Sequence, residues 1–385
     1  MKKRNIAVVI TARPSYSRVK TLVAAIDKHP DLNLQLIVAA SALSARYGSA
    51  IDYIQSDGFE VTSKVYNLLE GENLISAAKT TGMGILELST VFDNLRPDIV
   101  VTVADRYETM ATAIAASYMN IPLAHIQGGE VTGNIDEKVR HSITKLSDYH
   151  FVSSEKAKER VLKLGEEEAF VFNTGCPSID LAVGIEPETP LGYDIYEKYG
   201  GVGAEVDISG KFVVVMQHPV TTEYEQARQQ ISTTLEAVRE LDVPTLWFWP
   251  NVDAGSDGTS KGLRTFRETH ESIKFHFFKH VDSQDFLRLI NRCSALIGNS
   301  SAGIREAAFL GVPVVNIGSR QNGRDRGANV RDVVYDQQLI TQAAQQQIDH
   351  GKYQSDHLYG DGQSGERIAQ HLAEVELRFH KTLTY

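Results

Sequence analysis

The sequence has few of the residues that build disulfide-bonded, metal-dependent or membrane-spanning proteins. Only two cysteines occur among the 385 residues, Cys176 and Cys293, and neither has the CxxC spacing of a zinc cluster. We therefore expect no disulfide framework, and we expect Cys293 to lie in the core. The twelve histidines form no HxH or HExxH pattern, so no structural metal is expected. No apolar run approaches the ~20 residues that a membrane span needs.

Basic residues are also in deficit. Lys and Arg number 39 against 49 Asp and Glu, which gives a net charge of −10 and opposes non-specific nucleic-acid binding. The basic start of the chain leads into Ile6–Ile10, an apolar run too short for a signal peptide and expected to be a buried strand. We therefore predict a cytoplasmic enzyme that has a small-molecule substrate and no nucleic-acid or membrane partner.

The chain alternates apolar strand-like runs with helical segments, which predicts an α/β fold with mostly parallel sheets covered by helices. The turn after the first strand lacks GxGxxG, so a nicotinamide or flavin site is not indicated. The length suggests two or three domains. We predict a Rossmann-like domain over residues 1–183, a linker or hinge over 184–210, a second Rossmann-like domain over 211–364 and a helix over 365–385.

Acidic residues gather in the stretch from Asp98 to Phe151. Asp105 and Glu130 each follow an apolar strand, and Asp136 opens the next helix. Ligands of open α/β sheets bind outside the carboxyl ends of the strands. The three carboxylates are therefore predicted to face one crevice.

Some of these acids have simpler explanations. Glu137 and Asn134 have the spacing of a capping box, and Asp136 and Arg140 could form an ordinary i,i+4 pair. We favour a pair that faces the crevice, because both residues lie within the first two turns of a helix whose N-terminus points there.

Groups suited to phosphate appear at other strand ends. In the loop Gly298–Gly303, two serines, Ser300 and Ser301, and the helix N-terminus that follows favour a diphosphate, although a helix cap alone needs only one serine. His218 ends another strand and is a candidate contact, or general acid, for a leaving phosphate. Arg13, after the first strand, could fork onto phosphate oxygens or be an exposed loop arginine.

Seven short motifs follow one another along nearly the whole chain. They are Asp105-Arg106-Tyr107-Glu108, His125-Ile126-Gln127-Gly128-Gly129-Glu130, Asp136-Glu137 with Arg140 to Lys145, His218-Pro219-Val220-Thr221, Pro250-Asn251-Val252-Asp253, Gly298-Asn299-Ser300-Ser301, and Arg320-Gln321 with Arg324. In type and order they resemble the UDP-N-acetylglucosamine 2-epimerases, in particular the hydrolysing branch of bacterial sialic-acid pathways and of the animal bifunctional enzyme.

The resemblance implies a glycosyltransferase-B architecture, in which two Rossmann-like domains face each other across a cleft and the last helix returns to the first domain. It implies that Arg13 contacts the nucleotide, that the backbone of Val281 reads the uracil and that Glu306 accepts from the ribose hydroxyls. Without the resemblance, Arg305 and Glu306 would be interpreted as a surface pair. The remaining expected substrate-binding residues are Arg106, Arg140, Asn251, Ser300, Ser301 and Arg320. No cofactor is expected, and family members suggest a homodimer or homotetramer.

The family's reaction eliminates UDP across C1 and C2 of the sugar to give a 2-acetamidoglucal, and the hydrolysing branch then adds water to give N-acetylmannosamine. Asp105, Glu130 and Asp136 are the candidates for removing and returning the C2 proton, because crowded carboxylates push their pKa values apart. The sequence does not assign the base and the acid among them. His218 is the candidate for the departing diphosphate.

Some positions depart from the commonest family pattern. Ala104 replaces a glycine, which is tolerable if that residue avoids positive φ. Gln127 and the segment His218–Thr221 differ from the non-hydrolysing branch, so they count against a reversible epimerase that retains UDP.

The non-hydrolysing epimerase remains an alternative, and there are three others. The nearest is a hydrolysing 2-epimerase of UDP-2,4-diacetamido-2,4,6-trideoxyglucose, in the legionaminic-acid pathway. A retaining glycosyltransferase often has two glutamates eight residues apart, but Val314 stands eight after Glu306. A non-catalytic sugar-nucleotide-binding protein would not need three converging acids.

Overall fold

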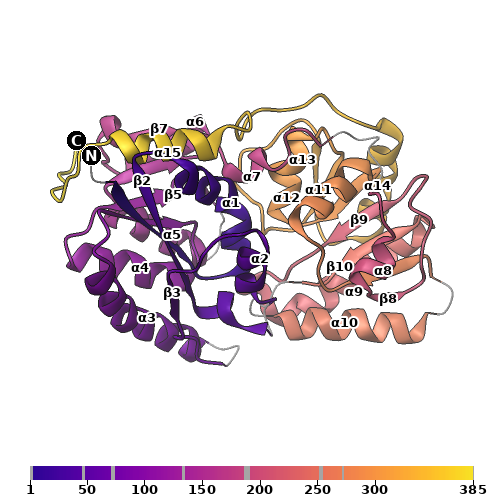
Figure 1. Cartoon of the computed structure of the whole chain (residues 1–385). Coiled ribbons are helices and arrows are strands. Elements are labelled where there is room, and N and C mark those ends of the chain that lie inside the picture. The colour runs from indigo at the N-terminus through magenta and orange to yellow at the C-terminus, as the bar shows by residue number, and fades with distance from the viewer. Residues whose placement is uncertain are drawn as a thin grey trace. The chain divides into compact units, whose positions relative to one another are not determined.

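The computed structural model describes residues 3–45, 48–70, 74–131, 135–185, 191–250, 255–270 and 273–384. These residues form two units. Unit 1 contains the described residues of Met1–Val131, Ile135–Leu181 and Tyr359–Tyr385, and unit 2 contains those of Ala182–Leu358. Each unit has a seven-stranded sheet in its described part (Figure 1). The prediction of two α/β domains with parallel sheets is confirmed.

The sheet of unit 1 is parallel throughout, in the order β3-β2-β1-β4-β5-β6-β7. Its strands are rich in β-branched residues and buried on both faces, as expected when helices cover a parallel sheet on both sides. The elements of this unit are β1 Arg4–Ile10, α1 Arg13–Lys28, β2 Leu32–Ala39, η1 Ala40–Leu43, α2 Ala50–Ser56, β3 Ser63–Val65, α3 Leu74–Leu95, β4 Ile99–Val103, α4 Tyr107–Tyr118, β5 Leu123–Ile126, α5 Ile135–Leu146, β6 Tyr149–Val152, α6 Glu155–Lys163, η3 Glu168–Phe170, β7 Val171–Asn173, α7 Pro177–Asp180 and α15 Ser364–Glu374.

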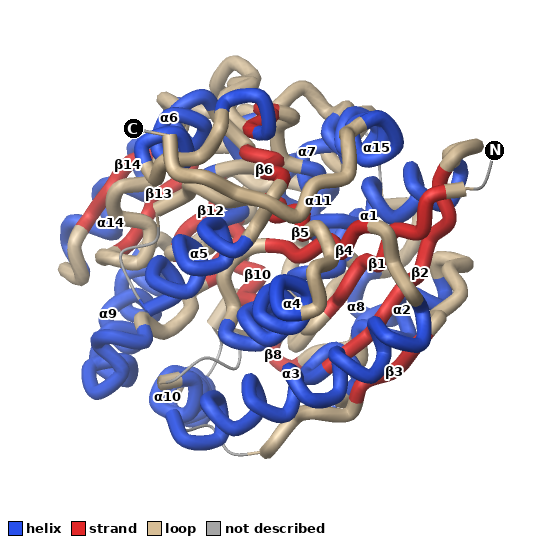
Figure 2. Tube along the Cα trace, turned by 90° about the vertical axis from the view of Figure 1, so that its left-hand side faces the viewer, coloured by secondary structure: helices blue, strands red, loops and turns tan. Residues whose placement is uncertain are grey.

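Successive residues of β1 enter different cores of unit 1, because side chains alternate along a strand. Ile6, Val8 and Ile10 pack in a core with residues of α1 and α15. Ala7 and Val9 pack in a second core with residues of α3 and α4. Figure 2 shows α3 and α4 side by side over this second face. The helices packed on the two faces of the sheet therefore hold the strand ends in place.

The sheet of unit 2 has the order β14-β13-β12-β9-β10-β11-β8, and only β8 is antiparallel among its described strands. The central strand β9 lies between β12 and β10, so the loops that follow β9, β12 and β13 leave the same edge side by side. The elements are α8 Ile195–Tyr199, β8 Val202–Gly203, β9 Val213–Met216, η4 Thr221–Gln226, α9 Ala227–Glu240, β10 Thr245–Phe248, α10 Ser256–Thr269, β11 Phe275–Phe278, α11 Ser283–Arg292, β12 Ala295–Gly298, α12 Ser301–Ile304, α13 Glu306–Phe309, β13 Val314–Ile317, β14 Val330–Val333 and α14 Gln337–His350.

Part of the segment interpreted as a linker, 184–210, is folded onto the second sheet. Strand β8 pairs antiparallel with β11, and the His276 ring nitrogens contact the carbonyl oxygens of Gly200 and Ala204 at 3.0 Å. A Cβ at Gly203 would lie 2.4 Å from the carbonyl oxygen of Phe275. Gly201 and Gly203, two of the glycines that suggested a linker or hinge, are therefore needed for close strand pairing.

The C-terminal helix is shorter than expected, since α15 ends at Glu374 and residues 375–384 are neither helix nor strand. The Arg4 guanidinium donates to the carbonyl oxygens of Leu372 and Val375 at 2.6 and 2.9 Å, which satisfies groups at the helix end. Further on, Lys381 donates to the carbonyl oxygens of Thr144, Lys145 and Ser147 at the end of α5. The extended tail thus stabilises the helix that carries Arg140.

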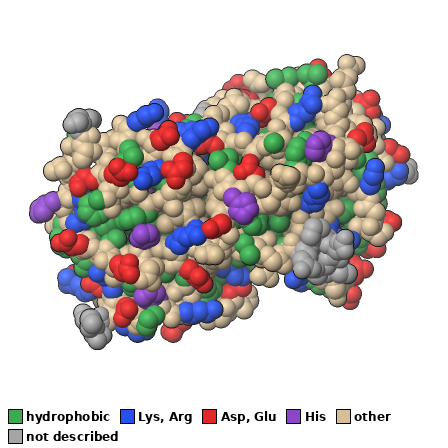
Figure 3. Space-filling model, turned by 90° about the horizontal axis from the view of Figure 1, so that it is seen from above, with side chains coloured by type: hydrophobic (Ala, Val, Ile, Leu, Met, Phe, Trp, Pro, Cys, Tyr) green, Lys and Arg blue, Asp and Glu red, His purple; other side chains and the backbone are tan. Residues whose placement is uncertain are grey.

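Acidic, basic and histidine side chains are interspersed on the face shown in Figure 3. In the part of the chain that the structure describes, no helix combines the length and the apolar character that a membrane crossing requires.

Candidate active site

In unit 1, the turn after β4 places Asp105. Ala104 directly follows the strand with φ +65°, and its N–H donates to the carbonyl oxygen of Ile126 at 2.9 Å. The condition under which alanine was expected to be tolerated, a φ that is not positive, is therefore not met. The neighbouring strand holds this residue in a left-handed conformation that costs a non-glycine residue about 1–2 kcal/mol.

His125, on the adjacent strand β5, braces the same turn. Burial lowers the pKa of His125 to about 3, so the imidazole is neutral at physiological pH. Its Nε2 donates to the Ala104 carbonyl oxygen at 2.8 Å, and Nδ1 accepts from the Thr144 hydroxyl of α5 at 3.2 Å. One buried ring thus ties the β4 turn to α5. The sequence interpretation gave His125 no role of its own, although its place in the glycine-rich motif was a signal.

Arg140 of α5 joins the two acidic strand ends. It is 1% exposed, its Nη2 contacts Oδ2 of Asp105, and its Nη1 donates to the Gln127 carbonyl oxygen at 2.8 Å. The Nη1 atom also lies 4.0 Å from Oε2 of Glu130. Asp105 and Glu130 are themselves buried. The structure therefore brings together these three predicted residues, with one guanidinium between two carboxylates.

This cluster leaves an excess of one negative charge when both carboxylates are ionised. Buried like charges disfavour simultaneous ionisation, whereas the guanidinium favours the charged form of its partner. Such an environment suits proton transfer, because it separates the proton affinities of neighbouring groups. Asp136 lies in the first turn of α5, but its side chain is outside the described residues, as is the possible cap residue Asn134. Glu137 contacts His141 at 3.3 Å.

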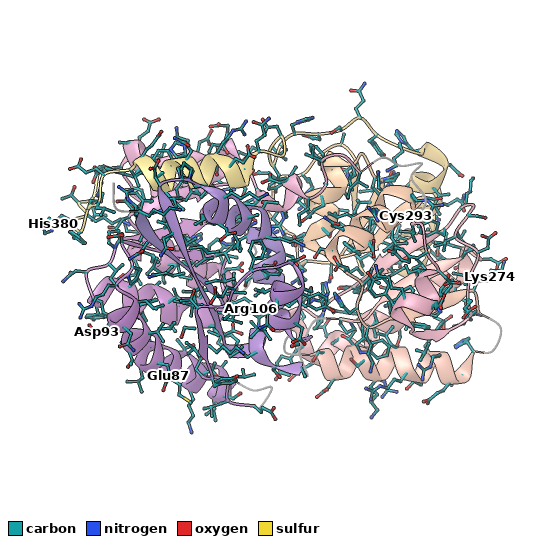
Figure 4. The ribbon with its side chains drawn as sticks, viewed as in Figure 1. Glu87, Asp93, Arg106, Lys274, Cys293 and His380 are labelled. Atoms are coloured by element: carbon teal, nitrogen blue, oxygen red, sulfur yellow. The ribbon has the colours of Figure 1, made fainter. Side chains whose placement is uncertain are left out.

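The two other arginines predicted in unit 1 have partners of their own. Arg106, labelled in Figure 4, forms a fork with the buried Glu108 at 3.1 and 3.2 Å. Arg13 is the first residue of α1, and its guanidinium carbon lies 5.5 Å from the centre of the Tyr53 ring. Arg13 is half-buried, so the alternative of an exposed loop arginine is wrong.

A buried contact missed from the sequence links Gln127 to Cys176. The Gln127 side-chain amide donates to the thiol sulfur at 3.0 Å, and the thiol also contacts the Ser178 hydroxyl at 3.0 Å. Gln127 itself has φ +65°, which turns its carbonyl oxygen to Arg140. The expectation of a buried Cys293 is confirmed (Figure 4).

In unit 2, Asn299 organises the strand ends. Its Oδ1 accepts from the His218 N–H at 2.7 Å, and its Nδ2 donates to the His218 carbonyl oxygen at 2.8 Å. The Asn299 carbonyl oxygen accepts from Arg320 at 3.2 Å and from Gln321 at 2.8 Å. The predicted residues His218 and Arg320 are therefore connected through Asn299, which the sequence interpretation did not single out.

The loop after Gly298 uses both of its serines. The Ser300 hydroxyl caps α12 by accepting from the Ala302 N–H at 3.3 Å, and the Ser301 hydroxyl accepts from Arg305 at 3.0 Å. Arg305 and Glu306 are both buried, with Nε and Oε2 3.9 Å apart, so their interpretation as a surface pair is wrong. The Oε2 atom of Glu306 is buried and has no hydrogen-bond partner within the described residues.

Val281 and Asn251 are the remaining predicted substrate-binding residues of unit 2. Val281 is buried between β11 and α11, where Asp282 caps the helix by accepting from Gln284 at 3.2 Å. Asn251 lies outside the described residues. Among the residues that the structure describes, no group of three or more His, Cys, Asp or Glu side chains is arranged to hold a metal ion.

Glu223 is another residue missed from the sequence. It accepts from the Ser319 hydroxyl and from Gln230 at 2.6 Å, which ties η4 to the loop before Arg320. Burial, followed by the negative charge of Glu223, raises the pKa of Tyr335 to about 12. A neutral phenol therefore lies beside this loop.

The chain matches a family model and is similar to several known proteins along nearly its whole length. Residues 24–373 match the family model described as UDP-N-acetylglucosamine 2-epimerase. A relative from Legionella pneumophila, UDP-N,N'-diacetylbacillosamine 2-epimerase (hydrolyzing), is 32% identical over 375 residues, which cover 97% of each chain. The UDP-N-acetylglucosamine 2-epimerase of Neisseria meningitidis is 31% identical over 370 residues, covering 95% of this chain and 94% of the relative.

A solved structure agrees in fold. The crystal structure of a Neisseria meningitidis UDP-GlcNAc 2-epimerase bound to UDP-GlcNAc has a TM-score of 0.80 at 19% identity, covering 96% of this chain and 100% of that chain.

Proposed function

From the premise that the chain belongs to the UDP-N-acetylglucosamine 2-epimerase family, we propose that it is a hydrolysing 2-epimerase of a UDP-linked 2-acetamido sugar. UDP-N-acetylglucosamine is the first proposed substrate, with N-acetylmannosamine for sialic-acid biosynthesis as the product. The observation that carries the proposal is the buried Asp105–Arg140–Glu130 cluster at two strand ends of unit 1.

The reaction has two balanced steps. A base removes the proton at C2 while the bond from C1 to the diphosphate oxygen breaks, which gives UDP and 2-acetamidoglucal. Water then adds its hydroxyl to C1 and gives its other proton to a carboxylate, while an acid delivers a proton to C2 from the opposite face. The first step needs a base, the second needs an acid, and the departing diphosphate needs a hydrogen-bond donor or a positive charge.

We assign proton transfer at C2 to Asp105, Glu130 and Asp136. Two carboxylates around one guanidinium support this assignment, because the protonation states of neighbouring acids diverge. His218 contacts the leaving diphosphate and donates to it. Substrate binding is proposed for a wider set of residues in both units, namely Arg13, Arg106, Arg140, Asn251, Val281, Ser300, Ser301, Glu306 and Arg320.

A second substrate has specific support. The Legionella relative is named for UDP-N,N'-diacetylbacillosamine and the Neisseria relative for UDP-N-acetylglucosamine, at 32% and 31% identity. These identities are too close to favour either sugar. The substrates differ at C4 and C6, so the mechanism is the same for both and the pathway is not.

The test is proton NMR of the purified protein in deuterated water with each nucleotide sugar. We expect release of UDP together with the 2-epimer carrying deuterium at C2. Turnover of the diacetamido sugar alone would change the pathway and leave the mechanism. Formation of a UDP-linked 2-epimer without free UDP would indicate the non-hydrolysing reaction, and no turnover of either sugar would contradict the proposal.

Three substitutions assign the acids. Asp105→Asn, Glu130→Gln and Asp136→Asn should each lower kcat by about 10²–10⁴-fold, the usual contribution of a general acid or base. UDP affinity, measured by calorimetry, should stay nearly unchanged. Glu306→Ala should instead weaken UDP binding. A variant of one of the three acids with wild-type turnover would remove that residue from the mechanism.

A further inference from the structure

Asn299 stands where the ladder between β12 and β9 ends. Gly298 pairs with Met216 as the last residues in register, and Gly298 then turns away with φ +133°. The Asn299 N–H still donates to the Met216 carbonyl oxygen at 3.1 Å. From this point the main chains diverge, yet both backbone polar groups of His218 remain paired with the Asn299 side chain.

Beyond the end of the ladder, the side-chain amide of Asn299 thus takes the place of a peptide group of the neighbouring strand. A carboxamide offers one acceptor and one donor in nearly the geometry of a peptide group, so it can pair with an N–H and a carbonyl oxygen of the same residue. Distances of 2.7 and 2.8 Å and complete burial make both bonds strong ones. His218 is therefore fixed by its backbone two residues beyond the end of β9.

The backbone of Asn299 extends this control to a third strand end. Its carbonyl oxygen receives the Arg320 guanidinium and the Gln321 amide from the loop after β13. Strand β12 lies between β9 and β13, so one residue connects the loops on both sides of it. We infer that Asn299 is a positioning residue, which sets His218 and Arg320 in the orientation needed to bind the leaving diphosphate; this inference rests on the proposed function.

The inference predicts a requirement for an amide rather than for a polar group of the same size. In Asn299→Asp the carboxylate keeps an acceptor for the His218 N–H but places a negative oxygen against the His218 carbonyl oxygen. A protonated Asp would restore the donor. Loss of activity in this variant should therefore depend on pH, with the ratio of variant to wild-type kcat rising as the pH falls.

The experiment measures kcat and KM for UDP release across a pH series for the wild type, Asn299→Asp and Asn299→Ala. We expect Asn299→Ala to lower kcat about 100-fold, the size of effect that misplacement of a catalytic group by ~1 Å can have. Asn329→Asp is the matched control. Asn329 is a buried amide of the same unit whose Nδ2 donates to Val312 at 2.8 Å, far along the chain from His218. Asn329→Asp should change the free energy of unfolding, but its ratio of variant to wild-type kcat should not rise as the pH falls.

A second readout separates this inference from the proposed function. Imidazole signals of isotope-labelled protein, with His218 assigned through His218→Gln, should shift in Asn299→Ala and remain in place in Asn329→Asp. An inactive wild type would contradict the proposed function and leave the NMR result to judge the positioning of His218. An unchanged His218 signal, or an Asn299→Asp variant whose relative kcat does not vary with pH, would overturn the role of Asn299. If Asn299→Ala fails to fold, the pH series of Asn299→Asp decides alone.

Discussion

In each unit one inner strand of the sheet, β4 or β12, ends in the same way, but the chemistry around the two strand ends differs. In each, a residue with positive φ directly precedes the first residue of the candidate site, Ala104 before Asp105 and Gly298 before Asn299. Unit 1 then places a buried guanidinium between two carboxylates. Unit 2 places a neutral amide against backbone groups, and the carbonyl oxygen of the same residue accepts from the half-buried Arg320.

The difference follows from what each half is proposed to do. Moving a proton requires groups whose ionisation is finely balanced, and buried opposite charges provide that balance. Holding a diphosphate requires donors fixed in direction, and in unit 2 Asn299 fixes His218 and Arg320 through hydrogen bonds of its amide and backbone, which do not titrate. Unit 1 should therefore be the more sensitive half to changes of charge, and unit 2 to changes of backbone shape.

The largest effect is expected from Arg140→Met. Removing the guanidinium leaves Asp105 and Glu130 buried without their shared partner, and breaking a buried ion pair typically costs about 3–5 kcal/mol. Urea unfolding can show which unit loses stability, because both tryptophans, Trp247 and Trp249, belong to unit 2. Far-UV circular dichroism should show the early transition, and tryptophan fluorescence should not.

Arg239→Met is the control for this substitution. Arg239 forms an exposed pair with Glu236 on α9 of unit 2, and such pairs contribute less than about 1 kcal/mol. If Arg140→Met were no more destabilising than Arg239→Met, the contrast between the two strand ends would not hold.

Gly298→Ala should have the next largest effect, in the opposite unit. Besides the strained φ, a Cβ at this position would lie 2.1 Å from the Met216 carbonyl oxygen, which cannot move without disrupting the ladder. Residues held in such regions of φ and ψ cost about 1–3 kcal/mol, and the overlap puts this case at the upper end. Tryptophan fluorescence should report the loss. A neutral result would mean that the backbone shape of unit 2 is adaptable.

Much of this arrangement was accessible from the sequence, and the reason is topological. Acidic residues after β4 and β5 had to meet at one sheet edge once the strands were parallel, so the meeting of Asp105 with Glu130 could be predicted. The left-handed Ala104, the role of the Asn299 amide and the pairing of β8 could not. Each depends on the distance between two backbones that are remote in sequence, and composition or periodicity carries no measure of that distance.

The same limit explains the errors at the chain's linker and C-terminus. The cluster at Gly200–Gly203 suggested a linker or hinge, although Gly201 and Gly203 let β8 approach β11. The helical pattern after Gly365 continued past Glu374, but Arg4 pairs with the last carbonyl oxygens and ends the helix. In both places a tertiary contact overrides a local preference.

Acid should weaken unit 1 through His125. The pKa of His125 is about 3 in the folded chain and about 6.5 in the unfolded chain, so below about pH 6.5 the unfolded state takes up a proton that the folded state does not. The contribution of the buried neutral imidazole to the free energy of unfolding is complete above that pH and is lost as the pH falls. Between about pH 7 and about pH 5 this amounts to about 2 kcal/mol.

His125→Gln tests this assignment, since its amide can still donate to the Ala104 carbonyl oxygen but does not titrate. The free energy of unfolding should fall less steeply with acid in the variant than in the wild type, by that amount. Equal slopes would show that His125 takes up its proton without loss of the fold.

The smallest expected effect, and the sharpest for the comparison, comes from Ala104→Gly. Alanine pays a steric cost of about 1–2 kcal/mol in the left-handed region, while glycine loses about 0.4–1 kcal/mol more chain entropy on folding. The net gain should be about 0.5–1 kcal/mol, visible as a higher urea midpoint by circular dichroism. The hydrogen bonds from Ala104 to Ile126 and from His125 to Ala104 involve only main-chain atoms of residue 104, so glycine keeps both. If the variant gains stability and loses turnover, the methyl group of Ala104 helps to hold Asp105 against Arg140. If it gains stability with turnover unchanged, the backbone strain at Ala104 has no part in the reaction. The two units then differ only in the chemistry of the residues that follow the turn.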